Sequence, residues 1–237
     1  FYINVPVGIV ALIITSSVLR LPFARRDHKI DYLGSALLVA AVTSWLLVAV
    51  WGGNEYAWGS GTIIGLAIAG AALTALFLLH ESRAPEPVLP LRLFRDPVFA
   101  VSTAASFIVG LSMFGVIIYV PLYLQVVNGA SPTKSGLLLT PLMLGLIVGT
   151  VGSGRIITKW GRYKAFPVAG MAIMALGIWL LAQFDTNTPR LTQSIYMAVV
   201  GLGIGLVMQV LVLAVQNSVP PEDLGTATSA TSFGTAA

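Results

Sequence analysis

Long stretches without a charged residue recur along this 237-residue chain, and they restrict its fold more than any other feature. A helix that crosses the hydrocarbon core of a bilayer needs roughly 20 mostly apolar residues. Charged residues make up only 9% of the chain, whereas a soluble domain carries about 25%. The pattern predicts an all-α polytopic membrane protein. Seven complete spans and the start of an eighth are expected at 4–20, 32–51, 61–80, 98–120, 136–156, 165–183, 194–216 and 224–237.

The basic residues fall between these spans and are unequally divided between the two sides. Lys134 and Arg190 fall on one side, and the other 11 of the 13 basic residues fall on the opposite side. Cytoplasmic loops carry an excess of Lys and Arg, so the basic side is expected to be cytoplasmic. The net charge of +4 therefore indicates membrane topology, and no nucleic-acid partner is predicted.

Enzymatic and metal chemistry find little support in the composition. The chain has no Cys, and its two His, His28 and His80, stand at the ends of predicted spans. A metal cluster or a nucleophile–base pair within the membrane would need more ligating or titratable side chains. We predict no catalytic residue, no metal and no cofactor. A channel is also disfavoured, because no ring of charged side chains or filter-like segment is recognisable.

Four stretches carry motifs in the order and spacing of one known family. The first contains Asn4, Pro6 and Gly8. The second contains Pro121, Gln125, Gly129, Ser131, Pro132, Gly136 and Pro141. The third contains Gly152, Gly154, Arg155, Lys159, Gly161 and Arg162, and the fourth covers 219–229. Together they resemble the major facilitator superfamily, in its fourteen-helix drug:proton antiporter branch.

The resemblance implies a fold, a function and partners. The chain would hold the sixth to twelfth helices and the start of the thirteenth, as a C-terminal fragment truncated at both ends. The parent would be a multi-pass transporter of the plasma or inner membrane. It would export drugs or other small amphipathic substrates in exchange for protons, by alternating access. The partners would be the lipid bilayer, substrate and proton, and the missing N-terminal helical bundle, without which the fragment is expected to be inactive. An importer or exporter of a specific metabolite is the alternative.

The third motif would form a cytoplasmic loop with a physical rationale of its own. Gly152 and Gly154 would allow close approach of a neighbouring helix, and Gly161 would allow a tight reversal. Lys159 and Arg162 could bind a helix C-terminal dipole or an acidic partner. Either the loop acts as a gating latch, or its cations only enforce topology. Thr158 stands where the family's first copy has an acid, which argues against a salt bridge within the loop.

The acidic residues all stand near loops or helix ends. None lies in the middle of a predicted span, where a carboxylate would be a candidate proton carrier. The resemblance therefore implies that the proton-carrying residues lie outside this chain. We expect Asp31, at the start of the second span, to cap a helix rather than to carry protons.

Two spans would face the substrate cavity if the resemblance holds. The candidates are Ser112, Met113 and Tyr119 on the fourth span and Met208, Gln209 and Gln216 on the seventh. Gly201 and Gly205 share the arc of the seventh-span candidates, so this face is either cavity lining or a helix-packing seam.

The tyrosines of the fourth span and segment 83–96 each have two possible interpretations. Tyr119 is either a cavity residue or part of an interfacial aromatic belt, and the belt is favoured for Tyr123. Segment 83–96 is either an interfacial segment on the cytoplasmic side or an ordinary loop.

Overall fold

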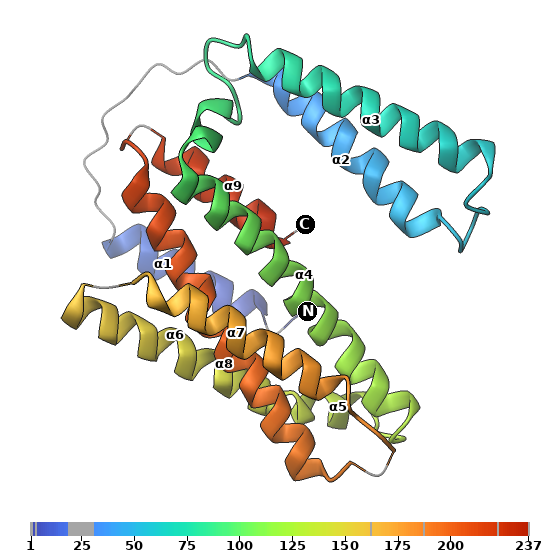
Figure 1. Cartoon of the computed structure of the whole chain (residues 1–237), viewed down its shortest axis with the longest axis vertical. Helices are drawn as coiled ribbons and strands as arrows, with labels where there is room; N and C mark the ends of the chain where they lie inside the picture. The colour runs from blue at the N-terminus through green and yellow to red at the C-terminus, as the bar shows by residue number, and fades with distance from the viewer. Residues whose placement is uncertain are drawn as a thin grey trace.

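The computed structural model describes residues 2, 4–18, 31–161, 163–186, 188–221 and 223–236, and no strand occurs among them. The predicted all-α class is confirmed. In chain order the helices are α1 (Asn4–Val18), α2 (Tyr32–Trp51), α3 (Gly61–Glu81), the short 3₁₀ helix η1 (Leu91–Arg95), α4 (Pro97–Val126), α5 (Pro132–Leu138), α6 (Thr140–Trp160), α7 (Ala165–Leu181), α8 (Arg190–Ser218) and α9 (Leu224–Ala236) (Figure 1).

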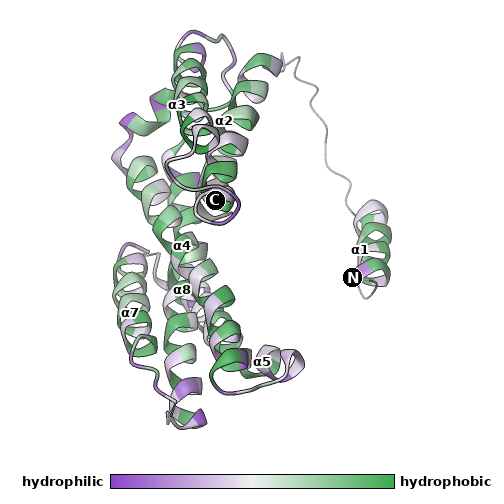
Figure 2. Ribbon diagram, turned by 90° about the vertical axis from the view of Figure 1, so that its right-hand side faces the viewer, coloured by the Kyte–Doolittle hydropathy of each residue, from purple (hydrophilic) through white to green (hydrophobic). Residues whose placement is uncertain are grey.

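Five helical segments of the described chain are long and apolar enough to cross a membrane. They are α2, α3, α4, the stretch 132–160 that contains α5 and α6, and α8. The helices α1 and α7 are apolar but shorter, with 15 and 17 residues. Hydrophobic residues run along the helices, whereas hydrophilic ones gather near their ends and in the connections (Figure 2). This distribution fits helices with lipid along their length and water at their ends.

The predicted span at 136–156 does not form as one helix. α5 ends at Leu138 and α6 begins at Thr140, with Leu139 between them. Pro141 lies in the first turn of α6, where the backbone N–H that proline lacks would have no partner inside the helix. In the interior of a continuous helix, Pro141 would remove a backbone hydrogen bond. Pro121, by contrast, lies inside the unbroken helix α4.

Short polar side chains define several helix starts. Asp31 caps α2 by accepting a hydrogen bond from the Gly34 N–H at 2.8 Å, as the sequence predicted. Ser60 caps α3 in the same way, and Asp96 accepts from Val98 N at 2.7 Å at the start of α4. These caps satisfy N–H groups that have no partner inside the helix.

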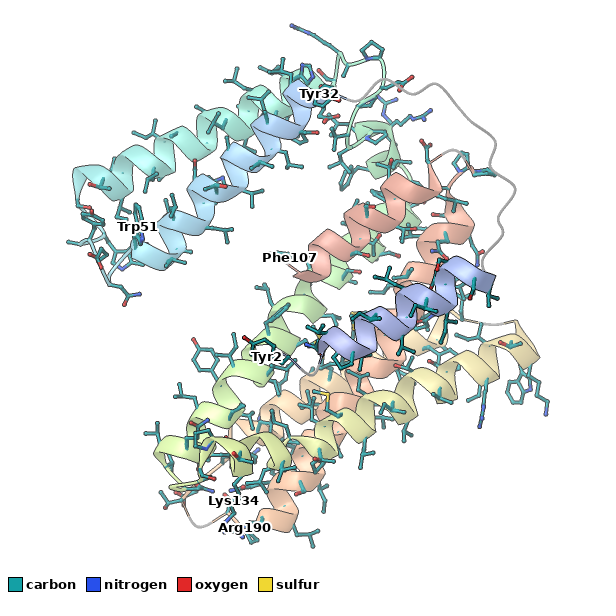
Figure 3. The ribbon with its side chains drawn as sticks, turned by 180° about the vertical axis from the view of Figure 1, so that it is seen from behind. Tyr2, Tyr32, Trp51, Phe107, Lys134 and Arg190 are labelled. Carbon is teal, nitrogen blue, oxygen red and sulfur yellow. The ribbon has the colours of Figure 1, made fainter. Side chains whose placement is uncertain are left out.

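The largest buried cluster lies between α4, α6, α7 and α8. Fully buried side chains include Leu124, Leu142, Val200 and Ile204. α6 and α7 both pack along α8, which has the most buried residues of the described helices. Lys134 and Arg190 lie at the same end of this group (Figure 3), as their predicted location on one side of the membrane requires.

The helices α2 and α3 form a separate antiparallel hairpin. Trp45 Nε1 donates to Thr74 Oγ1 at 3.2 Å, and the Trp45 ring lies over Gly70. Figure 1 shows the pair standing apart from α4 and α6–α9. All residues of α1 are exposed.

Segment 83–96 connects this hairpin to α4 and packs on the other helices through η1. Leu93 is buried in a small cluster with Phe99, Val215 and Ala227. Arg92 forms an ion pair with Asp223, with Nη2 at 2.9 Å from Oδ1. The segment is therefore held by α4, α8 and the start of α9, and its location at a membrane interface stays a prediction.

Candidate functional site

Four glycines form the contact between α6 and α8. Gly145 and Gly149 are one helical turn apart on α6, and Gly201 and Gly205 are one turn apart on α8. A Cβ added to Gly149 would lie 2.6 Å from the Leu202 carbonyl oxygen, and one added to Gly201 would overlap the Leu142 carbonyl oxygen. The two backbones therefore approach as closely as small residues permit. Thr150 Oγ1 also donates across the contact to the Gly205 carbonyl at 3.3 Å.

A second face of α8 contacts α7 in a similar way. A Cβ on Gly203 would lie 2.5 Å from Met174 N, and one on Gly177 would lie 2.6 Å from Val200 Cγ2. α8 is thus fixed on two sides by glycine contacts. The alternative of a packing seam is correct for Gly201 and Gly205, and the expectation that they line a cavity is wrong, because α6 covers them.

The three predicted cavity residues of α8 divide between two environments. Met208 is half-buried and packs against the central cluster. Gln209 and Gln216 are exposed, two helical turns apart on one strip of the helix. Gln216 Nε2 donates to Thr228 Oγ1 of α9 at 3.3 Å. The strip therefore offers two exposed amide groups, with α9 beside it at Gln216.

The predicted residues of α4 are similarly divided. Tyr119 is 69% exposed, Ser112 is half-buried, and Met113 packs against the central cluster. The Tyr123 ring lies 5.6 Å from that of Phe184 and packs against the cluster, and its place in an interfacial belt stays a prediction. Its hydroxyl is buried without a hydrogen-bond partner in the described part of the chain.

The loop motif after α6 only partly matches expectation. Gly161 ends the helix with φ of 69°, a conformation that favours glycine, and its N–H bonds the Ile157 carbonyl at 2.7 Å. A Cβ added to Gly152 or Gly154 would have no neighbour within 4 Å, so no helix of the described chain approaches them closely, and the expected close approach stays a prediction. The buried residue between them, Ser153, continues the Gly145–Gly149 face that meets α8, and the two glycines flank that face.

The cations of this motif are exposed where the structure describes them. Arg155 and Lys159 point to solvent, and Arg162 lies outside the described residues. Thr158 stands where the family's first copy of the motif has an acid. Its Oγ1 donates a hydrogen bond to the Gly154 carbonyl of the same helix at 2.9 Å. The gating role of this loop stays a prediction.

The second motif stretch, which joins α4 to α5 and α6, has a clear structural role. Gly129 has φ of 62°, Ser131 caps α5 and Pro132 begins it. Gln125 Nε2 donates to Ser135 Oγ at 3.0 Å, and Ser135 is 1% exposed. Gly136 has no close neighbour, and Pro141 begins α6. Asn4, Pro6 and Gly8 lie on the exposed helix α1.

The acidic residues that the structure describes all stand at helix ends or in connections. Among them, Asp31 and Glu81 come together with His80 where α2 begins and α3 ends. The hydrogen bond from Gly34 N–H and the one from His80 hold the pKa of Asp31 below its ordinary value. No group of three ligating side chains suited to a metal ion occurs in the described ranges.

Sequence reasoning missed three arrangements. Gly145 and Gly149 carried a usable signal, because their four-residue spacing matches that of Gly201 and Gly205. The Arg92–Asp223 pair and the approach of Glu81 to Asp31 bring together residues far apart in the chain, and a single sequence offers no signal for such pairs.

A family model described as Major Facilitator Superfamily matches residues 1–237 of this chain. The chain belongs to the major facilitator superfamily. An MFS-type transporter of Mycobacterium tuberculosis (strain CDC 1551 / Oshkosh) is 48% identical over 235 residues, which cover 98% of this chain and 34% of that protein.

Two further relatives of this major facilitator chain have names that mention drugs. The multidrug transporter protein MdtP of Bacillus subtilis (strain 168) is 37% identical over 98% of this chain and 43% of the relative. A tetracycline resistance determinant of Streptomyces rimosus is 37% identical over 84% of this chain and 58% of the relative. The chain thus spans between a third and three-fifths of these relatives. Its family consists of transporters rather than enzymes.

Proposed function

We propose that the protein containing this chain is a secondary transporter that exports drugs or other amphipathic compounds in exchange for protons. The observation that carries the proposal is family membership together with the similarity to MdtP and to the tetracycline resistance determinant. The apolar helices support residence in the cell membrane, with lipid as a partner. The proton-carrying groups would lie outside this chain, because its described acids stand at helix ends.

The substrate would bind against the exposed strip of α8 that carries Gln209 and Gln216. Gln209 and Gln216 offer amide groups there, and an amide within a membrane must find a partner or water. Tyr119 on α4 adds an exposed aromatic ring. Met113 and Met208, which are partly buried against the central cluster, can change shape and so adapt to varied compounds. A second helical bundle, absent from this chain, would complete the cavity.

The test is accumulation of a fluorescent lipophilic cation in a drug-sensitive host that expresses the full-length protein. We expect lower accumulation than in cells without the protein, and loss of this effect when a protonophore collapses the proton gradient. Gln209→Leu should raise accumulation several-fold at an unchanged amount of protein in the membrane. Gln183→Leu is the matched control, because Gln183 is exposed in the α7–α8 connection.

Two outcomes would contradict this proposal. Efflux that persists without a proton gradient would exclude proton coupling. An unchanged accumulation of dyes and drugs, combined with a change in the uptake or release of one metabolite, would favour the alternative of a specific metabolite carrier. The 237-residue chain alone, reconstituted in liposomes, is expected to transport nothing.

A further inference from the structure

Three titratable side chains meet at one end of the α2–α3 hairpin. Asp31 caps α2, and His80 Nε2 lies 3.0 Å from its Oδ1 and 2.9 Å from its Oδ2. Glu81, the next residue along the chain and the last of α3, is only 3% exposed. No prediction from the sequence and no part of the proposed function uses this cluster.

The Glu81 carboxyl group is only half satisfied by hydrogen bonds. Its Oε2 accepts from the Leu89 N–H at 3.2 Å, whereas its Oε1 is buried without a partner among the described residues. A Cβ added to Gly34 would lie 3.2 Å from Glu81 Oε1 and would overlap Asp31 Oδ2. Both oxygens therefore approach the same side of Gly34. An ionised carboxylate only accepts hydrogen bonds, so a hydrogen is missing from this arrangement.

The charged groups around Glu81 do not supply that hydrogen. His80 is already directed at Asp31. Arg92 and Arg95 line a cavity of about 580 Å³ that Glu81 also borders, and Arg92 is paired with Asp223. Arg83 and Glu86, in the connection after α3, are exposed. Within the described ranges, Glu81 forms no ion pair with these arginines.

A single proton shared between the Glu81 and Asp31 carboxyl groups would make this arrangement favourable. A buried carboxylate without a donor is costly, and a second carboxylate nearby adds repulsion. When two carboxyl groups share one proton, the neutral acid donates to the ionised one and both penalties are reduced. Here the proton would sit on Glu81 Oε1 and be donated toward Asp31, while Oε2 keeps its bond from Leu89. His80 would hold Asp31 in place.

We propose that Glu81, Asp31 and His80 form a proton-binding site that holds the connection to α4 against the α2–α3 hairpin. Loss of the proton leaves two carboxylates side by side, and Glu81 turns toward the cavity that Arg92 and Arg95 line. The bond to Leu89 is then lost. Because only Pro90 separates Leu89 from η1, this change reaches the Arg92–Asp223 pair. The site thus senses pH at the end of the hairpin, separately from any proton carried with substrate.

Hydrogen–deuterium exchange of the full-length protein tests this directly through the Leu89 amide. After correction for the intrinsic effect of pH, we expect protection of this amide to fall several-fold from mildly acidic to mildly alkaline solution. Glu81→Gln mimics the neutral acid and should keep the amide protected at both pH values. Glu55→Gln is the matched control, because Glu55 is exposed at the opposite end of the same hairpin, and it should behave as the parent protein.

Infrared spectroscopy gives a second measurement, and its pH dependence in the unmodified protein needs no variant to fold. A protonated carboxyl band should be present in mildly acidic solution, disappear in parallel with the loss of Leu89 protection, and be absent in Glu81→Gln. Leu89 protection that is independent of pH, or a Glu81→Gln protein with the pH response of the parent, would overturn the proposal. So would the absence of the carboxyl band at every pH. Neither measurement depends on transport, so a failure here is distinct from a failure of the proposed function.

Discussion

Replacement of Gly201 by alanine should destabilise the protein, although alanine is the better helix former. In the helix interior alanine is favoured over glycine by about 1 kcal/mol. The new methyl group would, however, overlap the Leu142 carbonyl oxygen and lie 2.8 Å from its carbon. Overpacking of this kind costs about 1–3 kcal/mol, and a backbone neighbour cannot rotate away as a side chain can. The two estimates differ by about 0–2 kcal/mol, and because the overlap is with backbone atoms we expect a net loss in the upper part of that range, about 1–2 kcal/mol.

Gly152→Ala provides the matched control. Gly152 lies in the middle of α6 with nothing within 4 Å of an added Cβ. Only the higher helix propensity of alanine over glycine then affects stability, so this variant should be more stable than the parent by about 0.5–1 kcal/mol. The two changes are chemically identical and differ only in the neighbouring helix. Opposite signs are therefore expected from the geometry alone.

The stability changes of Gly201→Ala and Gly152→Ala can be measured by equilibrium unfolding of the full-length protein. The unfolding is carried out in mixed micelles with an increasing fraction of denaturing detergent. Circular dichroism reports the loss of helix, and the midpoint of each variant gives its free energy of unfolding relative to the parent. The double variant Gly201→Ala, Gly205→Ala should lose less than the sum of the single losses, because the first methyl group already separates α6 from α8. If Gly201→Ala were as stable as Gly152→Ala, the assignment of this contact would be refuted.

Three further changes follow from contacts at the helix ends. Arg92→Gln should lower the free energy of unfolding by about 1 kcal/mol more than Asp223→Asn does, because it leaves the buried Asp223 carboxylate unpaired. The same unfolding assay measures both variants, and equal losses would argue against the pair. Gly161→Val should destabilise by about 1–2 kcal/mol through its positive φ, and a neutral result by the same assay would contradict the left-handed helix end. The pKa of Asp31 is lowered from 3.8, so its ionised form stabilises the fold above that pH. This contribution to stability is lost as the pH falls through the lowered pKa. Asp31→Asn should therefore remove that part of the pH dependence of the free energy of unfolding.

The sequence predicted the helices well because the membrane imposes their length and composition. The predicted span at 32–51 coincides with α2, and the start of α8 was missed by four residues. The break between α5 and α6 was not predicted, although Pro141 carried the signal. An apolar stretch conceals such a break, because hydropathy does not register where the backbone hydrogen bonds stop.

The faces of the helices were harder to predict than the helices themselves. The sequence predicted one shared face for Gly201, Gly205 and Gln209, but Gly201 and Gly205 meet α6 whereas Gln209 is exposed. In a membrane both lipid-facing and protein-facing positions are apolar, so composition separates them poorly. Only the partner helix decides which face is covered. The same limit hid the approach of Glu81 to Asp31, which lie 50 positions apart.

The glycine contacts of α8 have a mechanical consequence. Two helices whose backbones touch along two successive turns cannot slide or rotate against each other without separating. α6, α7 and α8 should therefore keep their mutual geometry in any conformational change of the protein. Any bending must then fall on less tightly held parts, and Pro121, which removes a hydrogen bond inside α4, marks a natural hinge.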